Sequence, residues 1–117
     1  MTDDHVNDPE SLERARQIAK RALNGKHDLL LACRDLAALR AQLPALPEDA
    51  LDTFVAVASE VDDLPIGSER QHWAADALKR KDAEAQEYRE RVRGAVTDAL
   101  QKLLTVLESA AQNRSYH

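Results

Sequence analysis

Residues 83–111 read AEAQEYRERVRGAVTDALQKLLTVLESAA and carry the strongest periodic pattern in the chain. Apolar side chains recur every three or four residues, and this 3.6-residue period predicts an amphipathic helix. At 1.5 Å per residue the helix would be about 40 Å long. Its apolar stripe consists of Ala85, Tyr88, Val92, Ala95, Ala99, Leu103, Val106 and Ala110, widened by Val96, Leu100 and Leu107.

Shorter helices are predicted before this one, because helix caps and prolines divide the rest of the chain. Asp8 is a good N-cap and Pro9 suits the first helical position, so a first helix is expected over residues 9–24, ended by Asn24-Gly25. Asp28 can cap a second helix. Pro44 ends it, since the residue before a proline is disfavoured in the α region.

The next two segments are less clear in sequence. Pro47 predicts the start of a third helix, although residues 53–57 are β-branched enough to form a short strand. A lone strand would have no partner, so helix is favoured. Ser68 with Gln71 forms a capping box for a further helix, with a restart or kink near Asp82, because aspartate prefers caps to helix interiors.

These elements predict an all-α fold: a single-domain bundle of four to five mostly antiparallel helices with a long C-terminal helix. A chain of 117 residues fits one domain, with 1–8 and 112–117 expected to be frayed tails. The last helix is nearly twice as long as the others. Either two shorter helices pack end to end along it, or part of its face is left for a second copy in a homodimer.

Composition limits the expected cellular location and the kind of partner. The chain has one cysteine, an acidic N-terminus and no run of 18 apolar residues, which predicts a cytoplasmic protein that does not span a membrane. Its net charge is −5, and neither end carries a cluster of bases. We therefore expect no nucleic-acid partner.

Motifs for catalysis or metal binding are weak. Glu69 and His72 form a single E-x-x-H pair, whereas di-iron bundles use two such pairs and two more glutamates. Cys33 lies within a leucine stripe and is expected to be buried and inert, and His27 is badly placed to activate it. The sequence contains no G-x-G-x-x-G, Walker or G-x-S-x-G motif. We predict no catalytic residue, no metal and no cofactor, and an enzyme is the less favoured class.

Charge is segregated along the chain. Residues 41–69 contain seven acids and no base, whereas residues 14–40 contain seven bases and only two acids. Trp73 follows the acidic block and is one of four aromatic residues; a core anchor is the favoured interpretation, and a contact for a partner is the alternative. The predicted partner-binding residues are Glu48, Asp49, Asp52, Glu60, Asp62, Asp63, Glu69 and Trp73.

Residues 59–67, followed by Arg70, Trp73, Leu78 and Asp82, resemble a block in a small bacterial all-helical family. The resemblance covers about a fifth of the chain. The family brings no known activity, ligand or cofactor, so it implies no functional residue. It does imply that the loop and Trp73 form one unit. Such a unit is physically sensible, because Leu64 and Ile66 can turn inward while Asp62 and Asp63 stay in water.

Two classes of function stay open. The first is a small acidic protein-interaction module that binds a basic protein partner, of which toxin neutralisation by an immunity-like protein is one example. The second is a small-molecule-binding or enzymatic helical bundle that uses the region from Asp62 to Trp73. A deep polar pocket converging on Asp62, Glu69 and His72 would favour the second class.

Overall fold

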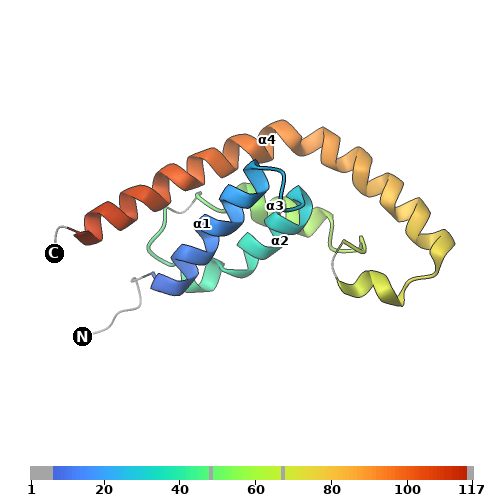
Figure 1. Ribbon diagram of the computed structural model, residues 1–117, viewed down its shortest axis with the longest axis horizontal. Coiled ribbons are helices and arrows are strands. Elements are labelled where there is room, and N and C mark those ends of the chain that lie inside the picture. Colours follow the sequence, from blue (N-terminus) through green and yellow to red (C-terminus); the bar gives the residue numbers. More distant parts are fainter. Residues whose placement is uncertain (1–6, 48, 67, 116–117) are drawn as a thin grey trace.

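The structure is a computed structural model that describes residues 7–47, 49–66 and 68–115. The predicted all-α fold is confirmed: the described residues form four α-helices and two 3-10 helices, with no strand. Helix α4 (Ala75–Ser115) arches over the other three α-helices, and its first turns project beyond them (Figure 1). Of the predicted tails, residues 1–6, 116 and 117 lie outside the described part.

The caps of the first two helices follow the sequence prediction. In α1 (Pro9–Leu23), the Asp8 carboxylate accepts the backbone N–H of Ser11 at 3.0 Å. In α2 (Leu29–Ala38), the Asp28 carboxylate likewise accepts the N–H of Leu31 at 3.0 Å. The turn between the helices passes through Gly25, whose φ of 76° favours a residue without a Cβ.

The chain after α2 departs from the predicted boundaries. The expected second helix is interrupted near Leu39 and tightens into the 3-10 helix η1 (Arg40–Gln42), as helix ends before a proline often do. The third helix was predicted from Pro47, but α3 (Asp52–Glu60) begins five residues later. Isolated turns fill the interval, which lets both Leu46 and Leu51 reach the core. Residues 53–57 are helical, so the strand alternative is wrong.

The region around Ser68 also differs. The predicted α-helix from Ser68 is the short 3-10 helix η2 (Ser68–His72), and α4 starts only at Ala75. No restart occurs at Asp82, so α4 is a continuous helix of 41 residues, longer than predicted. Asp82 is tolerated in the helix interior because its carboxylate accepts hydrogen bonds from Arg70 and does not compete for the helix backbone.

The core lies where α1, α2 and α3 meet the C-terminal part of α4. The largest fully buried side chains include Phe54, Leu30, Leu36 and Leu100. Trp73 is half-buried and is not part of this core, so the predicted core anchor is wrong. Within the described ranges, no helix is both long enough and apolar enough to cross a membrane.

Candidate functional site

The predicted acidic residues lie on α3 and on the turns that flank it. Asp49 and Asp52 are exposed where the helix begins, and Glu60 and Asp62 are exposed where it ends. The opposite face of α3 carries the buried Phe54, so the acids lie on its solvent side. Glu48 falls outside the described residues.

Two predicted acids pair with the protein's own bases. Arg34 of α2 donates to Glu69 at 2.8 Å, and the Lys81 ammonium of α4 lies 3.9 Å from the Asp63 carboxylate. Such partly exposed pairs contribute only about 0–1 kcal/mol each. Asp49, Asp52, Glu60 and Asp62 make no ion pair or side-chain hydrogen bond to the described part of the chain, and we call these four residues the open acids.

The segment that joins α3 to α4, of which residues 62–66 and 68–74 are described, is called the arm here and lies against the first turns of α4. Arg70 holds it closed: its guanidinium donates to both carboxylate oxygens of Asp82, at 2.5 and 3.1 Å, and to the Pro65 carbonyl at 3.1 Å. The hydrogen bond from Arg70 holds the pKa of Asp82 below its usual value. Arg70 therefore ties the loop at Pro65 to the first turns of α4.

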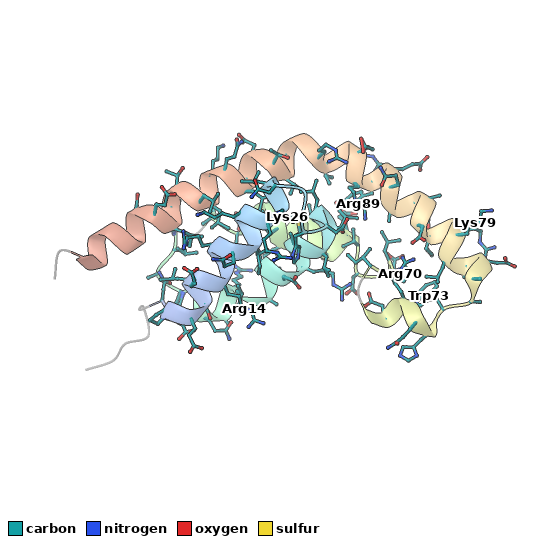
Figure 2. The ribbon with its side chains drawn as sticks, in the orientation of Figure 1. Arg14, Lys26, Arg70, Trp73, Lys79 and Arg89 are labelled. Atoms are coloured by element: carbon teal, nitrogen blue, oxygen red, sulfur yellow. The ribbon has the colours of Figure 1, made fainter. Side chains whose placement is uncertain are left out.

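Side chains within the arm follow the expected pattern. Leu64 and Pro65 are buried, Ile66 is partly buried against the core, and Asp62 and Asp63 are exposed. Figure 2 shows Arg70 and Trp73 between η2 and the first turns of α4. Trp73 therefore lies at the projecting end of the molecule.

Residues weighed for catalysis are not brought together. Glu69 pairs with Arg34, and His72 is exposed on η2. Among the residues placed by the structure, no three His, Cys, Asp or Glu side chains are grouped to hold a metal ion. Cys33 is buried, as predicted, and burial together with the Asp28 charge raises its pKa to about 12.

A histidine–aspartate pair was missed by the sequence analysis. His27 Nε2 lies 3.1 Å from the Asp35 carboxylate, and both residues line a cavity of 630 Å³ that Ser11 also reaches. The Ser11 hydroxyl, however, donates to Asp8 at 2.8 Å as part of the cap of α1. The serine is therefore occupied by a structural contact, and the three residues do not form a nucleophile–base arrangement.

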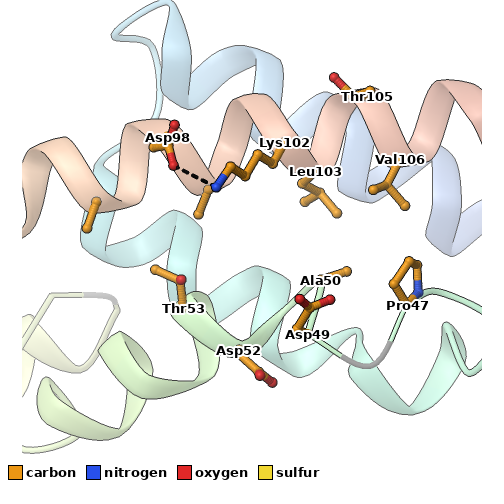
Figure 3. Close-up of a pocket in the computed structure, with 12 residues that line it drawn as sticks. Pro47, Asp49, Ala50, Asp52, Thr53, Asp98, Lys102, Leu103, Thr105 and Val106 are labelled. Carbon is orange, nitrogen blue, oxygen red and sulfur yellow. Dashed lines mark ion pairs between the residues drawn. The ribbon is translucent and has the colours of Figure 1, made fainter.

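A groove of 720 Å³ lies between the start of α3 and the C-terminal half of α4 (Figure 3). Asp49 and Asp52 line the groove on the α3 side, and Ala95, Ala99 and Val106 line it on the α4 side. In Figure 3 the side chain of Asp52 points away from α4. On the α4 side, Lys102 pairs with Asp98 at 3.1 Å. The groove thus combines an apolar side with two of the open acids.

The sequence held a signal for this groove. The predicted apolar stripe of the last helix was broader than the face that α4 buries over residues 75–109, which consists of Ala85, Val96, Leu100, Leu103 and Leu107. Ala110, the last residue of that stripe, lies outside the described side chains. Ala95 is exposed, and Ala99 and Val106 are only partly buried. The surplus edge of the stripe lines the groove. The residue spacing does not predict which segment lies opposite this edge of α4.

No protein-family model, curated protein or solved structure matches this chain. The comparisons therefore add no family, activity or partner, and the similarity of residues 59–82 to a bacterial helical family stays a resemblance.

Proposed function

We propose that this protein is a protein-interaction module that binds a basic protein partner through the open acids. The observation that supports the proposal is their geometry: Asp49, Asp52, Glu60 and Asp62 are exposed at the two ends of one short helix, and none of them pairs with a base among the residues that the structure describes. A partner that carries lysines and arginines at matching positions would neutralise them.

Folding alone gives little reason for this segregation. Exposed ion pairs contribute about 0–1 kcal/mol each, so a stable fold would gain little by separating acids from bases along the chain. Association gains more, because complementary charged surfaces raise encounter rates by roughly 10- to 1,000-fold. The open acids are thus better explained by recognition than by stability.

The proposed setting is the cytoplasm, and one proposed role is the neutralisation of a basic toxin by an immunity-like mechanism. In that role the acids would cover the toxin's cationic surface, which attracts an anionic substrate. Trp73 is retained as a proposed contact because it is only partly buried. Asp63 and Glu69 are weaker candidates, because a partner would have to compete with Lys81 and Arg34.

The alternative, a ligand-binding or enzymatic site in the region from Asp62 to Trp73, has less support. Glu69 is engaged by Arg34, and Asp62 and His72 both face solvent. A homodimer through α4 also stays a proposal, since the structure contains one chain.

The test is recovery of a partner from cells of the source organism, with three forms of the full chain as bait. One is the native protein, and one carries Asp49→Asn, Asp52→Asn, Glu60→Gln and Asp62→Asn. The third is a control with Glu10→Gln, Asp76→Asn, Glu87→Gln and Glu108→Gln, all exposed positions elsewhere. Both variants change the net charge from −5 to −1, because each loses four negative charges.

The proposal predicts that a basic protein is recovered with the native chain and the control, and is lost with the first variant. Equal recovery by the two variants, or a partner whose contact surface is acidic or apolar, would contradict it.

A further inference from the structure

The surplus apolar edge of α4 and the two acids opposite it form one continuous groove. Ala95, Ala99 and Val106 lie on α4 at spacings of four and seven residues, so they follow one side of the helix. Asp49 and Asp52 line the groove on the α3 side, on the turn before α3 and on its first residue (Figure 3).

The shape of the groove favours a helix as its occupant. From residue 95 to residue 106 the open edge of α4 runs for about 16 Å, which matches three turns of a second helix. Alanine side chains at two of the three positions permit a close approach of helix axes, of roughly 8 Å. The described residues contain no strand, so the groove has no sheet edge to which an extended peptide could add.

The charge of the groove selects the kind of helix. Lys102 is already paired with Asp98 on its own helix, at 3.1 Å. Asp49 and Asp52 are open acids, so the rim formed by α3 carries uncompensated negative charge. A helix that placed apolar residues against α4 would bring its flank beside these two carboxylates, where lysine or arginine is favoured.

We infer that the groove binds an amphipathic helix of a partner protein, with its apolar face on Ala95, Ala99 and Val106 and its basic flank on Asp49 and Asp52. This inference rests on the proposed function, since it names the part of a basic partner that the open acids recognise. It also assigns roles to residues of α4 that lie outside the predicted site. Asp49 and Asp52 become contact residues, whereas Glu60 and Asp62 steer the approach of the partner.

The test uses a synthetic peptide of about 15 residues, long enough to form the three or four turns that the groove accommodates. The peptide carries leucine and alanine at helical spacing with lysine on both flanks. One comparison peptide has glutamate in place of lysine, and another has the same composition in scrambled order. Binding to the full-length native chain is followed by fluorescence anisotropy, and the site is mapped by amide chemical-shift changes.

The expected result is binding of the lysine peptide alone, with shift changes confined to residues 49–53 and 95–106. Asp49→Asn with Asp52→Asn should weaken binding about ten-fold or more. Ala95→Gln, which adds bulk at an exposed groove position, should also weaken it, whereas Ala56→Gln on the exposed face of α3 should not. Amide spectra of each variant establish that the fold is retained.

Three outcomes would overturn the inference: no binding of the lysine peptide, equal binding of the scrambled peptide, or shift changes at the arm in place of the groove. A dimer in sedimentation velocity that Ala95→Gln dissociates would also overturn it, because the occupant would then be a second copy. A native partner that is lost on Glu60→Gln with Asp62→Asn, but retained on Asp49→Asn with Asp52→Asn, would leave the proposed function standing and refute the groove.

Discussion

The reactivity of the Cys33 thiol depends on its place on α2, where Leu29, Leu30 and Leu36 are also buried. Loss of water and the nearby charge of Asp28 raise its pKa to about 12. A thiolate is the reactive form of cysteine, so a pKa this high removes reactivity at neutral pH.

We predict slow modification of Cys33 in the folded protein. A pH of 8 lies well below this pKa of about 12, so very little of the Cys33 thiol is ionised to the reactive thiolate. Labelling by a thiol reagent should therefore be far slower than in urea-unfolded chain at the same pH. Native and unfolded protein labelled at matching rates would show that the site is open.

Leu100 links α4 to the core and is fully buried, whereas Leu104, one turn later, is only partly buried. We predict that Leu100→Ala lowers the free energy of unfolding by about 2–5 kcal/mol, because it removes buried methyl groups and leaves a cavity. Leu104→Ala is the matched control and should cost less. Urea unfolding of the two variants measures the difference, and equal losses would contradict the assigned orientation of α4.

Single residues also show where sequence reasoning is reliable. Cys33 and Phe54 belong to periodic stripes, so their burial could be predicted from spacing. Trp73 belongs to no stripe, and its large apolar side chain alone suggested the core. Its actual position depends on the non-local contact between Arg70 and Asp82, which spacing does not show.

The arm is held to the rest of the fold by Arg70, together with the Arg34–Glu69 and Lys81–Asp63 ion pairs. Arg70 bridges the Pro65 carbonyl and the Asp82 carboxylate, and thereby fixes the loop against the first turns of α4. The chain has a single tryptophan, Trp73, and it lies in this arm. Its fluorescence therefore reports on the arm without contributions from other tryptophans.

We predict that Arg70→Gln opens the arm while the helical core survives. Trp73 should then be quenched more strongly by acrylamide and should emit at longer wavelength, with the far-ultraviolet circular dichroism little changed. Arg80→Gln is the control, because Arg80 is exposed and makes no ion pair within the described ranges. Identical quenching in the two variants would contradict the role given to Arg70.

The contact between Arg70 and Asp82 predicts that the stability of the arm depends on pH. Because Arg70 lowers the pKa of Asp82 in the folded chain, the ionised carboxylate stabilises the arm above the ordinary aspartate pKa of 3.8. This stabilisation is lost as the pH falls through the lowered value. Acrylamide quenching of Trp73 should therefore rise below pH 3.8 in native protein, and the Arg70→Gln variant should lack this acid transition. An equal transition in both proteins would assign it to other carboxylates.

Element boundaries were predicted well where a local cap determines them, as at Asp8 and Asp28. They were missed at Pro47, Ser68 and Asp82, where the outcome depends on distant partners. The turns before α3 bring Leu46 and Leu51 to the core, and Arg70 engages Asp82 within a continuous helix. Neither contact could be inferred from local periodicity.

At the scale of the whole molecule, the chain is elongated. Its radius of gyration is 15.7 Å, compared with about 13 Å for a compact domain of this length. The excess comes from α4, because its first turns extend past the other helices, where the arm joins them (Figure 1). This shape leaves α3, with its open acids, and the adjacent edge of α4 accessible to a partner.

The sequence shows the acids on this surface as a block without bases. It does not show which of them pair with bases in the fold and which stay unpaired. Pairing of Asp63 with Lys81 and of Glu69 with Arg34 depends on how α2, the arm and α4 pack. The sequence therefore predicted a site of seven acids and Trp73. The structure leaves four of these acids unpaired among the residues that it describes. The groove beside two of these acids could be recognised only from the folded structure.

Recognition through the open acids is tested most directly by the association rate constant with the recovered basic partner, measured by stopped flow over a range of salt concentrations. We predict that neutralising the four open acids slows association at low salt by about ten-fold or more and flattens its salt dependence. The control variant, with four neutralised acids at Glu10, Asp76, Glu87 and Glu108, should associate at nearly the native rate. Equal rates and equal salt dependence for the two variants would contradict recognition through the open acids.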